Sequence, residues 1–283
     1  MPTNTQQPHS TPKVKRVNIQ HVLSSQLQLC NRASLVESFT DTKDKARLMC
    51  LTAKTTGMWL CPTKHTSRDG IWIRSPDTFR TAARLRLGAA VTHKAEPCLK
   101  CQAKGTSNAQ VPRDVFGHHT VCCMIGGDRC RLHNAVCRQL VKDATYGLLH
   151  PGRETHPFGD GQRLDFTFVM PKVGTELLVD VALTFPLRAD SIAAAMAKAG
   201  GAATSYEAVK QRTYGHRLGP RQKLVPLIFD TFGGAGESGI ALLNLIAVAY
   251  TRRRGSRSGR AIFFSRLNTL IVSSVAAAVR SCA

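Results

Sequence analysis

The stretch RLDFTFVMPKVGTELLVDVALTF, residues 163–185, decides the fold expected for this chain. It contains two apolar runs with the alternation of strands, at about 163–170 and 176–185, joined by the turn sequence PKVG. Each run carries an aspartate, Asp165 in the first and Asp180 in the second. Because side chains alternate along a strand, Asp165 is expected opposite Phe166 and Phe168, and Asp180 opposite its valine neighbours. A hairpin could therefore bring the two carboxylates together on one face.

Two carboxylates side by side in an apolar segment are costly unless a cation neutralises them. Mg²⁺ is a hard cation that prefers carboxylate and carbonyl oxygens, so Asp165 and Asp180 are predicted magnesium ligands. A bound Mg²⁺ can activate water and stabilise the charge that develops on a phosphate during hydrolysis. The alternative is structural: each aspartate caps a neighbouring element or pairs with an arginine.

A lysine near such a pair can orient the water or stabilise the transition state. The position two residues after Asp180 is Ala182, so the lysine must come from elsewhere in the chain. Residues 204–219 read as a helix opened by a capping box from Thr204 to Glu207. Lys210 lies on this helix, in one stripe with Tyr206 and Tyr214. It is the predicted third catalytic residue, and a solvated surface lysine is the alternative.

The surrounding elements predict an α+β fold. Residues 129–147 have the apolar stripe of a helix. Residues 223–232, KLVPLIFDTF, read as a strand, and Pro226 indicates an edge position or a bulge. The second half of the chain therefore reads helix, strand, strand, helix, strand, helix. We expect a small mixed β-sheet flanked by helices and preceded by a helical segment and a cysteine-rich segment.

The cysteine-rich segment has the ligand spacing of a closed zinc site. Cys98 and Cys101 form a C-x2-C pair, and His119 and Cys123 follow with H-x3-C spacing, which supplies the four soft donors of tetrahedral zinc. His118 and Cys122 have the same spacing and remain an alternative pair. The segment has few apolar residues of its own, so it needs such a staple. A rival ligand set lies on one helix face, where core packing is the more common role, and consists of Cys130, His133 and Cys137.

The charge balance points to a polyanionic partner. The chain has 39 Lys and Arg against 18 Asp and Glu, a formal charge of +21, which indicates DNA or RNA binding. A basic loop is expected at residues 251–260, where phosphate contacts would make binding depend strongly on salt. Neither a secretory leader nor an apolar run of spanning length is seen, so we expect an intracellular protein with free cysteines and no membrane partner. Arg163 is expected to contact nucleic acid as well. The arginines expected to contact phosphates in the loop are Arg252, Arg253, Arg254, Arg257 and Arg260.

The order of these motifs resembles the C-terminal region of site-specific non-LTR retrotransposon reverse transcriptases, over about residues 75–240. The motifs, in order, are FRTAARLRLG, CLKC, GHHTVCC, RLHNAVCRQL, RLDFTF, LLVDVALTFP, YEAVKQRTY and LVPLIFDTFGG. That region is a zinc knuckle followed by a restriction-like endonuclease of the PD-(D/E)XK type. The family's R-P-D motif is matched by Arg163 and Asp165, with Leu164 in place of the proline. The spacer before the knuckle histidine is longer here than the family usually has.

The resemblance implies a DNA-nicking module. Asp165 and Asp180 would hold Mg²⁺, Lys210 would assist catalysis, and Cys98, Cys101, His119 and Cys123 would hold structural zinc. The family's polymerase signature Tyr-x-Asp-Asp is absent from this chain, so an upstream reverse transcriptase is expected as a partner. A protein that nicks DNA is expected in the nucleus. The alternative is a non-catalytic zinc-containing nucleic-acid-binding protein, such as a decayed element fragment. The implied organisation is a disordered basic tail (1–18), a helical linker (19–95), the knuckle (96–128), the endonuclease (129–250), and a basic loop with a C-terminal helix (251–283).

Overall fold

The computed structural model describes residues 19–60, 72–105, 112–158, 162–170 and 174–281. The predicted tail, residues 1–18, lies outside this part of the chain. The chain divides into two units, Met1–Thr40 and Asp41–Ala283. The described part of the first unit is helix α1, Ile19–Ser38. All other elements belong to the second unit.

A four-stranded mixed sheet forms the centre of the second unit, in the order β3-β4-β5-β6. Strands β3, β4 and β5 run antiparallel in sequence, whereas β6 runs parallel to β5. Phe166 pairs with Val179 across β4 and β5, which fixes the hairpin register. The strand bounds are Gly152–Thr155 for β3, Leu164–Met170 for β4, Thr175–Thr184 for β5 and Gln222–Asp230 for β6.

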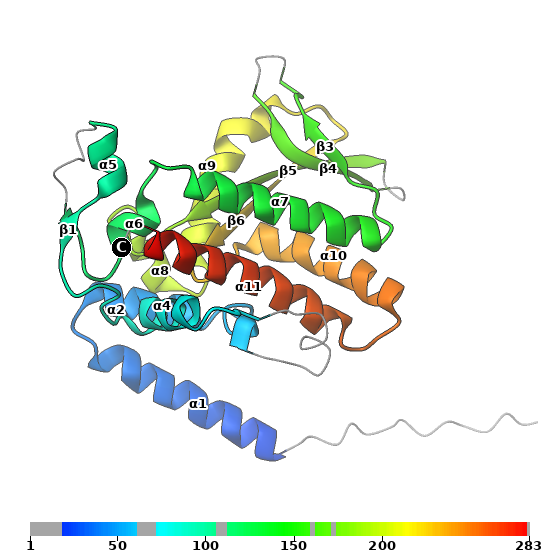
Figure 1. The fold of residues 1–283 in the computed structure, drawn as a ribbon. Coiled ribbons are helices and arrows are strands. Elements are labelled where there is room, and N and C mark those ends of the chain that lie inside the picture. The colour runs from blue at the N-terminus through cyan, green and yellow to red at the C-terminus, as the bar shows by residue number, and fades with distance from the viewer. Residues whose placement is uncertain (1–18, 61–71, 106–111, 159–161, 171–173, 282–283) are drawn as a thin grey trace, which may run out of the picture. The chain divides into compact units, whose positions relative to one another are not determined.

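Helices cover both faces of this sheet (Figure 1). On one face, α7 and α10 pack against the strands with α11 beside them, and their apolar side chains form one core with Phe166 and Val179. On the other face, α9 packs along β5 and β6. The helix bounds are Thr42–Leu51 (α2), Met58–Leu60 (η1), Pro76–Leu87 (α4), Leu99–Ala103 (α5), His118–Cys122 (α6), Asp128–Tyr146 (α7), Ile192–Ala197 (α8), Gly201–Tyr214 (α9), Gly215–Arg217 (η2), Glu237–Arg254 (α10) and Gly259–Arg280 (α11).

This arrangement confirms the predicted α+β class and the small mixed sheet flanked by helices. The alternation expected for the hairpin is present in its middle, where Phe166 and Phe168 are buried on the α7 face. Pro226 lies in β6, and β6 is an edge strand, as the proline indicated. An edge strand tolerates proline because its outer side has no neighbouring strand that needs a backbone N–H.

The capping box predicted from Thr204 to Glu207 is wrong. Helix α9 begins three residues earlier, after Gly200, whose φ of 72° suits a glycine at the helix start. The Glu207 carboxylate instead accepts the backbone N–H groups of Ser238 and Gly239, at 3.0 and 2.8 Å. It thereby caps the N-terminus of α10, where negative charge is favoured. Lys210 keeps its predicted place on the helix.

The basic loop predicted at residues 251–260 is also mostly helical. Arg252, Arg253 and Arg254 form the last turn of α10, and Arg260 lies in the first turn of α11. Arginine is a good helix former and is favoured in a last turn, so the charge run extends α10 until Gly255, which adopts a left-handed conformation at φ 65°. Among these arginines only Arg257 lies between the two helices.

Helix α11 is the one described helix with the length and apolarity of a membrane span. The short apolar runs of the sequence had predicted no such segment. However, 61% of its most apolar window is buried inside the protein, where it packs against α4, α7 and α10. A core helix of a water-soluble fold has the same composition, so this feature alone is weak evidence for a membrane.

Candidate metal centre and hairpin site

Four side chains of the cysteine-rich segment converge on one point and could hold a metal ion. The ligand atoms of Cys98, Cys101, His119 and Cys123 all lie within 4.8 Å of one another. The Cys98 and Cys123 sulfurs are 3.9 Å apart, the Cys101 and Cys123 sulfurs 3.6 Å, and Cys101 Sγ lies 3.5 Å from His119 Nε2. These are the four residues singled out by the C-x2-C and H-x3-C spacing.

The spacing of these atoms suits tetrahedral zinc. With Zn–S bonds of about 2.3 Å and Zn–N bonds of about 2.0 Å, a regular tetrahedron places two sulfurs about 3.8 Å apart and a sulfur and a nitrogen about 3.5 Å apart. The observed separations of 3.6, 3.9 and 3.5 Å lie within a few tenths of an ångström of these values. The donor set of three thiols and one imidazole is also that of a closed structural site.

Local structure places each ligand. Cys98 precedes α5 and Cys101 lies within it, so one helical turn brings the two sulfurs to the same side. His119 lies in α6, and Cys123 follows its end. The Asp114 carboxylate accepts the backbone N–H groups of His118 and His119, at 3.1 and 2.8 Å, and so fixes the start of α6.

This segment has little other core. Its separate buried cluster consists of Cys98, Cys101 and Cys123, with Ile125 packed against them. Hydrogen bonds outweigh the effect of burial at Cys98 and lower the pKa of its thiol to about 7. At Cys123 burial dominates and raises the pKa to about 12. A metal would replace both thiol protons and join the two halves of the segment.

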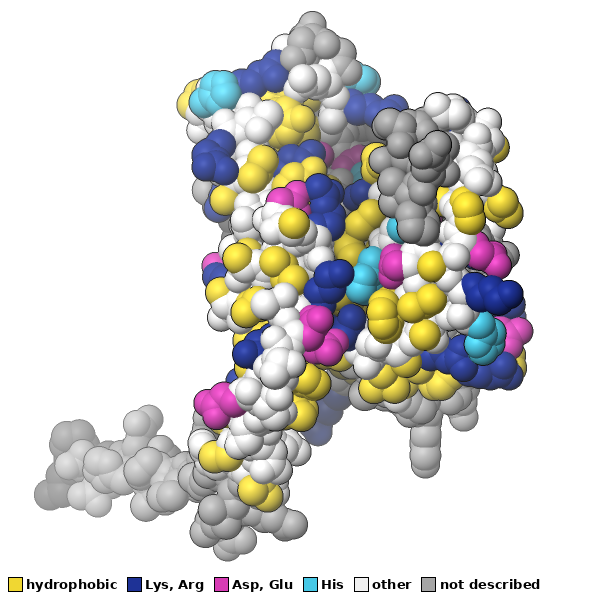
Figure 2. Space-filling model, turned by 90° about the vertical axis from the view of Figure 1, so that its left-hand side faces the viewer, with side chains coloured by type: hydrophobic (Ala, Val, Ile, Leu, Met, Phe, Trp, Pro, Cys, Tyr) yellow, Lys and Arg dark blue, Asp and Glu magenta, His cyan; other side chains and the backbone are white. Residues whose placement is uncertain are grey.

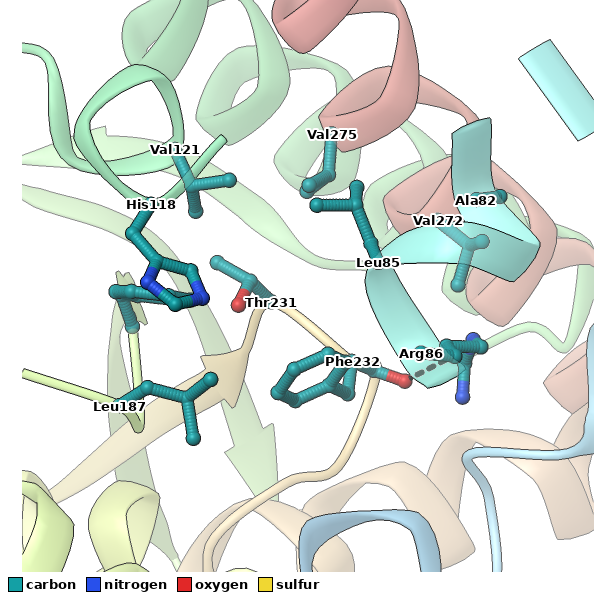
Figure 3. Close-up of a pocket in the computed structure, with 11 residues that line it drawn as sticks. Ala82, Leu85, Arg86, His118, Val121, Leu187, Thr231, Phe232, Val272 and Val275 are labelled. Atoms are coloured by element: carbon teal, nitrogen blue, oxygen red, sulfur yellow. Dashed lines mark hydrogen bonds between the residues drawn. The ribbon is translucent and has the colours of Figure 1, made fainter. Parts of the chain in front are cut away.

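The alternative ligands His118 and Cys122 do not join this cluster. His118 points into an apolar pocket with Leu85, Leu187 and Phe232 (Figure 3). Its ring lies 5.5 Å from that of Phe185, and burial lowers its pKa. The Cys122 side chain packs against the main core. Because neighbouring residues of α6 point in different directions, only one of each adjacent pair can face the other two cysteines.

The second acid of the hairpin is paired with the predicted lysine. Asp180 Oδ2 lies 2.8 Å from Lys210 Nζ, and both side chains are largely buried. The Lys210 ammonium also lies over the rings of Tyr206 and Tyr214, at 5.8 and 5.4 Å from their centroids. Burial raises the pKa of the Asp180 carboxyl, and the negative charge of Asp165 adds to this. Burial alone would lower the pKa of Lys210, but the Asp180 carboxylate outweighs it and raises that pKa.

Asp165 contacts the backbone next to Asp180. Its Oδ2 accepts the N–H of Val181 at 2.6 Å and lies 3.3 Å from His133 Nε2. His133 Nε2 is also 3.0 Å from the carbonyl oxygen of Val181. The hydrogen bond to Asp165 raises the pKa of His133 to about 11, because the carboxylate favours the charged imidazole. Asp165, Val181 and His133 thus form a small polar cluster beside the ion pair of Asp180.

The strand changes its alternation at Asp165. Leu164 packs with Leu178 and Leu224 on the α9 face, whereas Phe166 packs on the α7 face, although a regular strand would put both on the same side. This irregularity directs the Asp165 carboxylate to the β5 backbone and to His133 of α7, whereas Asp180 points to Lys210 of α9. The prediction that the hairpin brings both carboxylates together on one face is therefore wrong. Through Val181 N, covalent geometry still keeps the two carboxylates within about 8 Å. A shared Mg²⁺ ion requires their oxygens to come within about 4 Å.

A cavity of about 520 Å³ opens beside Asp165. Arg138 and Arg163 line it, so guanidinium groups lie at the same opening as the carboxylate. His133 and Cys137 line it as well; the sequence had placed these two in a set with Cys130. Cys130 is exposed and does not belong to the group that surrounds Asp165. Sequence spacing could not reveal the contact between His133 and Asp165, because they lie 32 positions apart on different elements.

The arginines of the α10–α11 turn lie at a distance from the hairpin site. Tyr250 of α10 packs against Tyr146 at the C-terminal end of α7, with ring centroids 4.9 Å apart, and Figure 1 shows the turn at that end. His133 lies thirteen residues earlier on α7, about 20 Å along the helix axis. Two of the arginines have protein partners: Arg254 contacts the Tyr250 hydroxyl at 3.2 Å, and Arg260 donates to Asn244 at 2.7 Å.

The face drawn in Figure 2 mixes basic, acidic and apolar side chains, without a single continuous basic patch. No protein-family model matches this chain, and no curated protein sequence matches it.

Proposed function

We propose that this protein is a Mg²⁺-dependent DNA endonuclease module of the non-LTR retrotransposon type, which nicks DNA by hydrolysing a phosphodiester bond. The observation that supports this most is the 2.8 Å ion pair of Asp180 and Lys210, on two different elements, directly beside Asp165. An acid pair with a lysine on the following helix is what the resemblance to restriction-like endonucleases implies, and in that arrangement a metal ion and an ammonium group would both stabilise charge on the phosphate.

Each residue has a role in this proposal. Asp165 and Asp180 would hold Mg²⁺, which supplies an activated water and neutralises charge on the phosphate. Lys210 would orient that water or stabilise the pentavalent phosphate. Its position over two tyrosine rings restrains the flexible side chain, so the ammonium is held in place before substrate binds. The Val181 carbonyl is a further oxygen within reach of the acids.

Arginines could hold the DNA beside the acids and farther along α7. Arg163 and Arg138 line the cavity next to Asp165, where a phosphate could bind in reach of the metal. The exposed Arg252, Arg253, Arg257 and Arg260 lie near the C-terminal end of α7, and that end is about 20 Å along the helix from His133. In this proposal zinc at Cys98, Cys101, His119 and Cys123 is structural, the partner is DNA in the nucleus, and the chain works with an upstream reverse transcriptase.

Incubation with supercoiled plasmid tests the proposal. With Mg²⁺ the protein is expected to convert supercoiled plasmid to the nicked circle, and with EDTA it is expected to leave the plasmid intact. Binding is measured separately by gel shift in Ca²⁺, at several salt concentrations. Affinity should fall steeply with salt, since several phosphate contacts release counterions.

One structural observation favours the non-catalytic alternative, and one result of the plasmid experiment would decide for it. Asp165 and Asp180 already have protein partners in the structure, as two structural aspartates would. Salt-sensitive binding without nicking, in Mg²⁺ or Mn²⁺, would overturn the endonuclease proposal and support a zinc-containing nucleic-acid-binding protein.

A further inference from the structure

A second group of metal-ligating side chains surrounds Asp165. His133 and Cys137 lie one turn apart on α7, and Asp165 reaches them from β4. The ligand atoms of these three residues lie within 4.8 Å of one another. Cys137 Sγ is 3.8 Å from His133 Nε2, which in turn is 3.3 Å from Asp165 Oδ2.

The donor types differ from those that Mg²⁺ prefers. Mg²⁺ binds oxygen ligands, whereas a thiolate and an imidazole select borderline and soft ions such as Zn²⁺. The Val181 carbonyl oxygen, 3.0 Å from His133 Nε2, is the nearest further donor. Three protein ligands on an open cavity leave a position for water, as in zinc sites that are not closed.

We propose that His133, Cys137 and Asp165 form a second transition-metal site, which takes Zn²⁺ in a three-ligand geometry separate from the closed cysteine cluster. The Asp165 carboxylate beside the His133 ring is negatively charged and favours a cation at this point. In the absence of metal, the His133 N–H shares this place with Asp165 and Val181. Metal binding requires the ring nitrogen and the Cys137 sulfur to release their protons to solvent.

Zinc at this site would inhibit DNA nicking. This effect rests on the proposed function, whereas the metal site itself does not. Zn²⁺ bound to Asp165 would compete with the Mg²⁺ that Asp165 shares with Asp180. Excess zinc should therefore inhibit nicking by the wild type. In a Cys137→Ser variant, half-inhibition, measured relative to its own zinc-free rate, should require about tenfold more zinc.

Cobalt titration tests the metal site without DNA. The protein is first loaded with one equivalent of zinc for the cysteine cluster, and Co²⁺ is then added while released zinc is measured with an indicator. We expect one further equivalent of Co²⁺ to bind without zinc release and with a thiolate-to-metal absorbance band. Cys137→Ser should lose this band, and Asp165→Asn should weaken binding by about tenfold or more.

Cys130→Ser is the matched control, because Cys130 lies on the same helix but is exposed and outside the cluster. It should retain the second equivalent and its band. His133→Gln provides a second independent loss of a ligand if the Cys137 variant is unstable. The proposal is overturned if no second equivalent binds, if Co²⁺ only displaces zinc one for one, or if Cys137→Ser keeps the thiolate band. None of these results depends on whether the protein nicks DNA.

Discussion

Replacement of Asp180 by asparagine is expected to lower the single-turnover rate of plasmid nicking by about a thousandfold. Asparagine keeps the shape of the side chain but has no charge to hold Mg²⁺. It also leaves the Lys210 ammonium, 2.8 Å away, without its counter-ion. Asp165→Asn should have a loss of similar size, because each change removes one of the two carboxylates that are proposed to hold Mg²⁺. The measurement is the rate of nicking at saturating protein, with gel shift in Ca²⁺ to show that DNA is still bound.

Asp190→Asn is the control for this experiment. Asp190 is an exposed acid in an ion pair with Arg188 at 2.7 Å, so its loss should leave the rate within about twofold. Lys210→Met should cost roughly a hundredfold, less than loss of a metal ligand. If Asp180→Asn nicks at the wild-type rate while it remains folded by circular dichroism, Asp180 is not a metal ligand and its ion pair is structural.

Loss of the cysteine-cluster metal is expected to unfold residues 96–128. A closed zinc site contributes folding free energy directly, on the order of 10 kcal/mol in small zinc modules. Here the buried cluster of this segment consists mainly of the ligands themselves, so little apolar contact remains without the ion. Cys98→Ser and Cys123→Ser should therefore purify with less than about a tenth of the wild-type zinc. Elemental analysis gives the zinc content, and limited trypsin digestion shows the opening at Lys100 and Arg113.

Adjacent residues provide matched controls for the zinc site. Cys122→Ser and His118→Ala should each retain about one zinc per chain, because both side chains face other parts of the protein. Each control replaces the same type of residue as a proposed ligand, one position away from that ligand in the sequence. If Cys122→Ser loses zinc while Cys123→Ser retains it, the cluster is assigned to the wrong cysteine.

The sequence predicted those parts of the fold that depend on local patterns. The hairpin at residues 163–185, the helix over 129–147 and the edge strand with Pro226 follow from periodicity and from the chemistry of proline. The four residues of the cysteine cluster also follow from their spacing, because one turn of α5 or α6 places the two members of each pair on the same side of the helix. The adjacent alternatives could not be separated, since the direction of α6 depends on its Asp114 cap and on its packing.

Long-range contacts could not be predicted in the same way. The sequence suggested that Glu207 caps its own helix. Its carboxylate instead caps α10 through the backbone N–H of Ser238, 31 positions later in the chain. The irregularity at Asp165 is set by the packing of Leu164 and Phe166 on opposite faces, which alternation alone does not show. The charge run at Arg252–Arg254 was assigned to a loop because the helix ends only at Gly255.

Binding of Mn²⁺ to the zinc-loaded protein tests most directly whether one divalent ion is held by Asp165 and Asp180. Mn²⁺ is a substitute for Mg²⁺ that can be followed by paramagnetic resonance as free ion disappears. We expect one Mn²⁺ per chain for the wild type and for Asp190→Asn, and a loss of at least tenfold in affinity for Asp165→Asn and Asp180→Asn. Equal Mn²⁺ affinity in all four proteins would show that the two aspartates do not hold a shared ion.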